Sequence, residues 1–174
     1  AQIVVSDFIF GGMENTTATT MYEHILLDER AAIDLSADDL IAHELAHQWF
    51  GDLVTCRDWS HGWLNEGFAT FMEHVYRDHH LGRDEYDYGV RTDMDAYIGE
   101  ARTRYKRPIV CQDYEAPIDI FDRHLYEKGA CVLHLLKQEL GDSLFWKGVG
   151  LYLKRHTKSV VETRDLMRAL EEVS

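Results

Sequence analysis

Residues 43–47 read His-Glu-Leu-Ala-His, and residues 63–69 read Trp-Leu-Asn-Glu-Gly-Phe-Ala. Residues four apart on an α-helix lie nearly above one another, so His43 and His47 can reach the same point. Glu44 is displaced by about a quarter turn and can flank that point without reaching it. Together with the carboxylate of Glu66, the two imidazoles form a ligand set for one zinc ion and leave a fourth position open for water. An open position is typical of a catalytic zinc and not of a structural one.

The sequence around the two histidines predicts the helix that this ligand geometry requires. Residues 36–39, Ser-Ala-Asp-Asp, form a capping sequence with acidic residues in the first turn. Apolar residues then recur with a helical period, at Leu40, Ile41, Leu45, Trp49, Phe50 and Leu53. We therefore expect a helix from about Asp38 to Thr55. The competing interpretation is a pair of buried core histidines without a metal, and the additional presence of Glu66 argues against it.

Composition and charge limit the possible partners. The chain has 174 residues, of which 45% are hydrophobic, and this is enough for one domain with a sizeable core. The net charge of −13 argues against nucleic acid, because its phosphates would be repelled, but is compatible with ligands that carry a positive amine. No apolar run approaches membrane-spanning length, and no leader peptide opens the sequence.

The location of the protein is left almost open by the sequence. Three widely spaced cysteines, Cys56, Cys111 and Cys131, form neither a C-x-x-C metal motif nor an even disulfide framework. Reduced thiols are therefore expected, which points weakly to the cytoplasm. The chain begins at Ala1, inside a strand-like segment, so we expect it to be cut from a longer polypeptide.

The pattern along the chain predicts a mostly α-helical α+β fold. Strands are expected at residues 2–10 and 21–27, both within a small β segment over residues 1–35. A helical body is expected over residues 36–174, with further helices at about 64–81, 83–104, 126–140, 143–157 and 162–173. The two parts are expected to form a single domain over residues 1–174.

A second motif, Gly-Gly-Met-Glu-Asn at residues 11–15, precedes the histidine helix. By itself it would more often be a turn that leaves a strand. Together with the zinc set, it makes the chain resemble the zinc aminopeptidases of the aminopeptidase N family (membrane alanyl aminopeptidase) in the gluzincin clan, which include leukotriene hydrolase. These proteins carry Gly-x-Met-Glu-Asn, then His-Glu-x-x-His, then a glutamate after eighteen intervening residues, as between His47 and Glu66. The resemblance also covers residues 47–55, residues 63–69 and the Tyr-Glu-Lys-Gly at residues 126–129.

The resemblance implies a thermolysin-like zinc metallopeptidase catalytic domain with a small β remnant at the N-terminus. It implies that His43, His47 and Glu66 bind one zinc ion and that Glu44 is the general base. Tyr126 would donate a hydrogen bond to the oxyanion of the tetrahedral intermediate. The alternative for this tyrosine is packing at the start of a helix.

For the motif at residues 11–15, the resemblance implies substrate binding by Gly11, Gly12, Met13, Glu14 and Asn15. Glu14 would bind the free α-amino group of a peptide, and the two glycines would let the backbone approach a substrate strand closely. The family commonly has alanine where this chain has Gly12. Asp52 and Glu73 could hydrogen-bond the outer nitrogens of the zinc histidines, although a solvated or capping role is open for both.

The expected function is therefore removal of N-terminal residues from peptides that have a free N-terminus. A thermolysin-type endopeptidase and an epoxide hydrolase could use the same zinc site. An inactive zinc-binding scaffold is the alternative of a different class, and the presence of Glu44 and all three ligands argues against it. The family has flanking domains before and after this region, so we expect efficient turnover only in their presence. The preferred N-terminal residue, the physiological substrate and the oligomeric state stay open.

Overall fold

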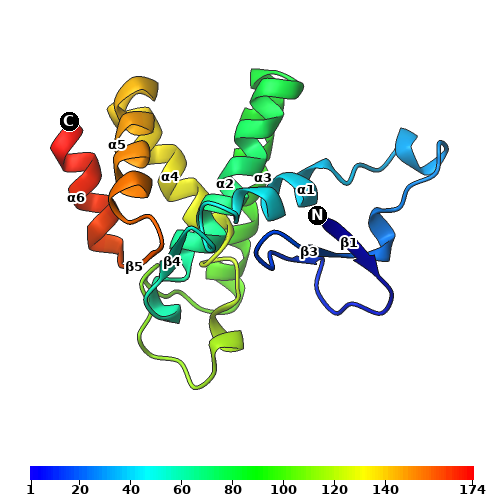
Figure 1. Cartoon of the computed structure of the whole chain (residues 1–174), viewed down its shortest axis with the longest axis horizontal. Coiled ribbons are helices and arrows are strands. Elements are labelled where there is room, and N and C mark those ends of the chain that lie inside the picture. The colour runs from blue at the N-terminus through cyan, green and yellow to red at the C-terminus, as the bar shows by residue number, and fades with distance from the viewer.

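The computed structural model describes all residues, 1–174. Figure 1 shows a small sheet and a long loop at the N-terminal side (blue) beside a body of helices (cyan to red). The fold is mostly helical with a small N-terminal sheet, as the sequence predicts. No helix combines the length and the apolar character that crossing a bilayer would require. The three cysteines are unpaired.

The N-terminal sheet has three short strands, β1 (Gln2–Val5), β2 (Gly12–Met13) and β3 (Thr19–Tyr22), in the order β1-β3-β2. β1 runs parallel to β3, and β2 runs antiparallel to it, with Gly12 opposite Met21. The predicted strand at residues 2–10 is too long, because Asp7 has a left-handed φ of 56° that ends the extended run.

The second predicted strand, at residues 21–27, overlaps β3 only at Met21 and Tyr22. β3 ends at Tyr22 and a 3₁₀ turn, η1 (Glu23–Ile25), follows it. Met21 is fully buried, whereas Leu26 is mostly exposed. The apolar residues after Tyr22 therefore have no core face to pack against, and the alternation that holds a half-buried strand is lost. A second 3₁₀ turn, η2 (Ala31–Ile33), lies in the loop that leads to the first helix.

The histidine helix, α1 (Asp38–Ala46), ends nine residues before the predicted boundary at Thr55. The chain then turns at Gly51, which has a φ of 137° and donates its N–H to the carbonyl of Val54 at 2.8 Å. It continues into β4 (Val54–Cys56), which pairs in parallel with β5 (Ser159–Val161). Phe50 and Leu53 continue the apolar period in the sequence, but they follow the end of α1 and flank the turn at Gly51, so this part of the period does not reflect a helix.

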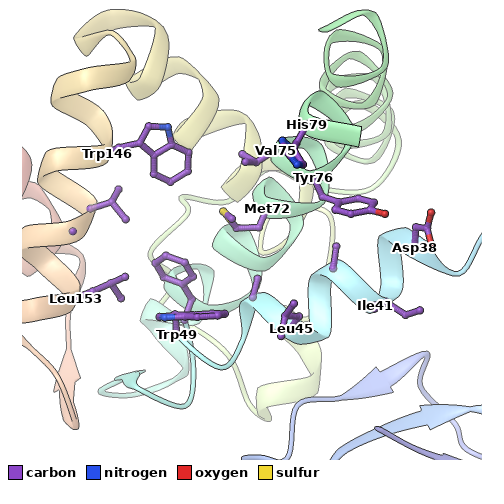
Figure 2. A pocket seen from close by; sticks show the side chains of 15 residues that line it. Asp38, Ile41, Leu45, Trp49, Met72, Val75, Tyr76, His79, Trp146 and Leu153 are labelled. Atoms are coloured by element: carbon purple, nitrogen blue, oxygen red, sulfur yellow. The ribbon is translucent and has the colours of Figure 1, made fainter. Parts of the chain in front are cut away.

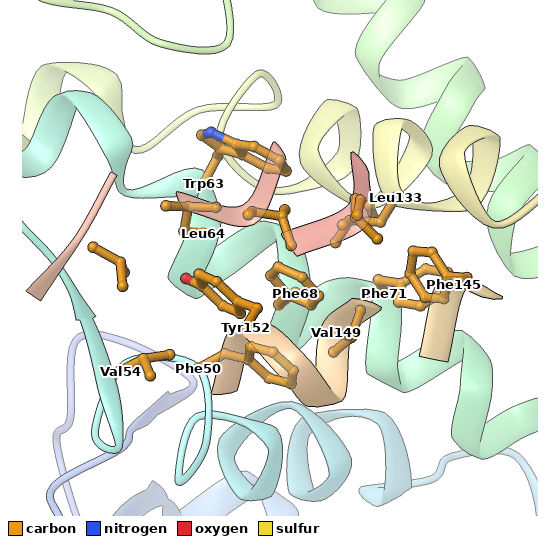
Figure 3. Packing of buried hydrophobic residues seen from close by; sticks show 14 of the residues in the cluster. Phe50, Val54, Trp63, Leu64, Phe68, Phe71, Leu133, Phe145, Val149 and Tyr152 are labelled. Atoms are coloured by element: carbon orange, nitrogen blue, oxygen red, sulfur yellow. The ribbon is translucent and has the colours of Figure 1, made fainter. Parts of the chain in front are cut away.

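The remaining helices lie close to their predicted ranges. They are α2 (Trp63–His80), α3 (Arg83–Thr103), α4 (Glu127–Leu140), α5 (Asp142–Arg155) and α6 (Thr163–Val173). Two further 3₁₀ turns, η3 (Trp59–His61) and η4 (Pro117–Ile120), precede α2 and α4. The core lies between α2, α4, α5 and α6, where Phe50 stacks on Phe68 with ring centroids 4.1 Å apart and Tyr152 lies beside Phe68 (Figure 3).

The face of α1 that points away from its histidines borders an apolar groove. This groove has a volume of 550 Å³ and lies between α1, α2 and α5 (Figure 2). Leu45, and Trp49 just after α1, are about half exposed there. Some of the apolar residues in this part of the chain therefore line the groove and are not buried in the core.

α2 and α4 make their closest approach at two glycines. A Cβ atom on Gly67 would lie 2.8 Å from the Cα of Gly129, which is shorter than any normal contact between carbon atoms. Glu66 precedes the first glycine directly, and Tyr126 lies three residues before the second. The distance between these two helices therefore fixes the distance between two of the predicted site residues.

Gly67→Ala is expected to destabilise the protein by about 1–3 kcal/mol, because the backbones of α2 and α4 must move apart to accept the methyl group. Gly99→Ala is the matched control, since Gly99 lies inside α3 with no atom near its missing Cβ. That change is expected to be stabilising by up to about 1 kcal/mol. Urea unfolding of both variants measures the difference, and equal stabilities would contradict the close-packing interpretation.

Candidate metal centre

Three side chains from two helices converge on one buried point. α1 supplies His43, His47 is the residue that caps the C-terminal end of α1, and the first turn of α2 supplies Glu66. The Nε2 atoms of the two histidines lie 3.1 Å apart, and Oε2 of Glu66 lies 3.2 Å from each of them. Ligands held about 2 Å from a tetrahedral ion lie roughly 3.3 Å from one another, so this spacing fits a single divalent ion such as zinc.

The electrostatics of the centre favour positive charge. Burial acts to raise the pKa of Glu66, but hydrogen bonds with His43 and His47 outweigh it and lower the pKa to about 2. Burial acts to lower the pKa of His43, but hydrogen bonds with Glu66 and Glu73 outweigh it and raise the pKa to about 10. A carboxylate that stays ionised while buried needs a cation beside it, which is what a divalent metal ion supplies.

Each histidine is oriented by a bond to its outer nitrogen. Nδ1 of His43 lies 2.7 Å from Oε1 of Glu73. Nδ1 of His47 lies 2.9 Å from the carbonyl oxygen of Phe50, which can only accept, so this nitrogen carries the proton. Nε2 of His47 is then free to bind a metal.

Of the two alternatives for Asp52, the hydrogen bond to the outer nitrogen of a zinc histidine does not form. Asp52 instead accepts a hydrogen bond from Nε2 of Gln48 at 2.9 Å. The turn at Gly51 carries the chain back over His47 and places a backbone carbonyl, that of Phe50, where a carboxylate was expected. No side-chain signal in the sequence could have shown this partner, because the acceptor belongs to the main chain.

Glu44 lies beside the three ligands and does not join them. It is 4% exposed, and its Oε2 has no hydrogen-bond partner. Burial raises the pKa of Glu44 to about 7. Strand β2 packs directly against it, since a Cβ atom on Gly12 would overlap the carboxylate. The glycine at this position therefore leaves the space that Glu44 occupies.

A cavity of 680 Å³ opens over the centre and collects most of the predicted site residues. Gly11, Gly12, Met13 and Glu14 line it from β2 and the residues beside it, and Tyr126 lines it from the start of α4. The ring of Tyr126 stacks near that of His43, with centroids 6.2 Å apart. Burial raises the pKa of Tyr126, so its hydroxyl keeps the proton that a donor needs.

Asn15 does not line this cavity. Its Nδ2 donates to Oγ1 of Thr20 at 3.0 Å, and its carbonyl accepts from the N–H of Ala18, so it closes the loop between β2 and β3. The apolar wall of the cavity was not predictable from the sequence. That wall consists of Phe10, Leu40, Trp59, Pro117, Ile118 and Phe121. Three of these come from the segment just before α4, and nothing in their spacing relates them to the metal ligands.

Comparison with known proteins agrees with this geometry. The model of the peptidase family M1 domain matches residues 1–174. The chain belongs to peptidase family M1. Aminopeptidase M1 of Arabidopsis thaliana is 39% identical over 183 residues, which cover 97% of this chain and 20% of that protein. Aminopeptidase M1-A of Oryza sativa subsp. japonica is 37% identical over 185 residues, covering 99% and 20%. The chain therefore spans about a fifth of the length of these M1 relatives.

Solved M1 structures share the fold. The M1 zinc metallopeptidase from Deinococcus radiodurans has a TM-score of 0.76 and 28% identity, covering 99% of this chain and 35% of that one. A mutant of that protein, bound to a Tyr-Ser-Ala substrate, has a TM-score of 0.75 and 29% identity, covering 98% and 35%.

Glu73→Gln is expected to lower the zinc affinity roughly 10–100-fold, because the outer nitrogen of His43 loses its charged acceptor. Asp52→Asn makes the same change of charge near the other histidine and is the matched control. Its zinc affinity is expected to stay within about twofold of the parent, since the Asp52 carboxylate does not hydrogen-bond the ring of His47. Competition with a chromophoric chelator measures both, and equal losses would contradict the assigned partners.

Proposed function

We propose that this chain is the catalytic segment of a zinc aminopeptidase, which hydrolyses the first peptide bond of peptides with a free N-terminus. The observation that carries the proposal is the convergence of His43, His47 and Glu66 at 3.1–3.2 Å, with Glu44 and Glu14 on the same cavity. Zinc held by the three ligands supplies a Lewis acid beside the scissile carbonyl and makes water a stronger acid. The solved M1 relatives that are named zinc metallopeptidases support the choice of metal.

Glu44 is proposed to move the proton. Its buried and unpartnered Oε2 is an acceptor without competition, so it can take a proton from the attacking water. The same oxygen then returns the proton to the leaving amine. Tyr126 is proposed to donate its hydroxyl proton in a hydrogen bond to the oxyanion, because its ring lies beside His43 at the edge of the cavity.

Glu14 is proposed to select the free N-terminus. Its carboxylate lines the metal cavity and is only 18% exposed. An ammonium group bound there forms a charge-assisted hydrogen bond that gains strength from partial burial. An internal peptide bond offers no such amine, so this contact favours an exopeptidase over a thermolysin-type endopeptidase.

Residues 1–174 are proposed to form one catalytic domain, with the β segment over residues 1–35 and the helical body over residues 36–174. The plant relatives are about five times as long, which supports flanking domains around this segment in the working enzyme. Those domains are proposed to supply a further contact to the substrate amine. The activity measurements below therefore use the full-length protein loaded with zinc.

The test of the proposed function compares a peptide with its N-acetylated form. Acetylation is expected to abolish cleavage, because it removes the positive charge that Glu14 binds. Product analysis by mass spectrometry distinguishes loss of the first residue from internal cleavage. Cleavage of both forms at the same rate would show an endopeptidase.

Glu44→Gln is expected to lower kcat by roughly 10²–10⁴-fold, because the amide cannot accept the proton. The same change at Glu171, an exposed residue of α6, is the control and is expected to leave kcat unchanged. Zinc content is measured in parallel and is expected to stay equal in all three proteins. Equal kcat values would contradict the role of Glu44, and no hydrolysis by any of them would favour the scaffold.

A further inference from the structure

A second cavity, of 480 Å³, adjoins the metal centre and is polar. It shares His43, Glu73, Phe121 and Tyr126 with the metal cavity, and it contains neither Glu44 nor any residue of the motif at 11–15. The two cavities therefore meet at these four residues, and the polar one does not reach Glu14. Five carboxylates line it against two guanidinium groups.

The carboxylates of this cavity are incompletely neutralised. Glu73 binds His43 through Oε1 alone, and Asp93 binds His74 through Oδ2 alone. Glu127 is only 7% exposed. Its Oε1 pairs with Arg123. Its Oε2 is buried and has no partner. Desolvated carboxylates of this kind are stabilised by a further cation.

The two arginines of the cavity do not provide that cation. Arg104 and Arg123 have side chains that are mostly exposed, so water screens their charges. Each is also committed to one neighbour four residues away, Arg104 to Glu100 and Arg123 to Glu127. The cavity therefore keeps an excess of acceptors and of negative charge.

The arrangement of the acceptors favours an extended cation over a compact ion. Glu73, Asp93 and Glu127 do not converge on one point as metal ligands would. Glu100, Asp122 and His124 do converge, but their charges are already used, since His124 binds Glu100 at 3.2 Å and Arg107 binds Asp122 at 2.6 Å. A guanidinium group, with five N–H donors on a planar fork, can reach separated carboxylates.

We propose that this polar cavity binds the basic side chain, arginine above all, of the second residue of the peptide. This inference rests on the proposed function. With the N-terminal amine at Glu14 and the scissile bond at His43, His47 and Glu66, the chain beyond the cleaved bond is proposed to leave toward the residues that the two cavities share. Tyr126 and Phe121 stand where the two cavities meet, so a side chain that passes them enters the carboxylate-lined space.

Binding to the zinc-loaded Glu44→Gln variant tests the proposal without turnover. The peptides are Leu-Arg-Ala and Leu-citrulline-Ala, which differ only in the charge of the second side chain. The arginine peptide is expected to bind about tenfold more tightly, as expected for a charge-assisted contact in a half-buried site. Equal dissociation constants in calorimetry would overturn the proposal.

Glu127→Gln, added to the same variant, is expected to reduce this preference at least about threefold. Glu139→Gln is the matched control, because Glu139 is an exposed residue of the same helix and the change of charge is identical. An unchanged preference in Glu127→Gln, or an equal loss in the control, would overturn the assignment. If Glu127→Gln does not fold, the comparison of the two peptides still decides.

The proposed function is tested separately by the parent protein. Hydrolysis of Leu-citrulline-Ala does not require the polar cavity, so cleavage of this peptide with no preference for arginine would contradict the cavity alone. Absence of cleavage for both peptides, with tight binding of the arginine peptide retained, would contradict the proposed function alone.

Discussion

The close approach of α2 and α4 at Gly67 and Gly129 determines the geometry of the whole site. Because neither residue has a side chain, the two backbones touch, and the first turn of α2 lies against the first turn of α4. Glu66 and Tyr126, which precede these glycines in the sequence, are thereby held at the same cavity. A larger residue at either position would push α2 and α4 apart, and this would move Glu66 and Tyr126 away from each other without any direct contact to a metal ligand.

The site concentrates buried ionisable groups, and both zinc histidines have hydrogen-bond partners on each ring nitrogen. His43 lies between two carboxylates, Glu66 and Glu73, and His47 lies between a carboxylate and a backbone carbonyl. Glu44 alone has a buried oxygen without a partner at the centre, and Glu127 has one in the neighbouring cavity. Buried polar atoms without partners are costly in a folded protein, so their position beside two cavities is informative.

The metal ligands can be predicted from the sequence, but most of the contacts that orient them cannot. Spacing on one helix predicts that His43 and His47 converge, because helical geometry is local. Glu66 belongs to a second helix, whose range the amphipathic pattern predicts well. The sequence does not reveal the end of α1, because Phe50 and Leu53 continue the helical period while the chain turns at Gly51.

Contacts made by the main chain or by distant segments have no signature in the sequence and could not be predicted from it. The acceptor for His47 is the carbonyl of Phe50, and the apolar wall of the cavity comes partly from the segment before α4. Asp52 and Asn15 have suitable side chains near the site, but these side chains hydrogen-bond Gln48 and Thr20 instead.

Under the proposed function, the position of β2 completes the site. β2 pairs only with β3 and so has one free edge, and an extended peptide can add to such an edge as a further strand. Because Glu14 follows β2 directly, a peptide paired with that edge would run from the amine-binding carboxylate toward the metal ligands, which gives the cavity a direction as well as a composition.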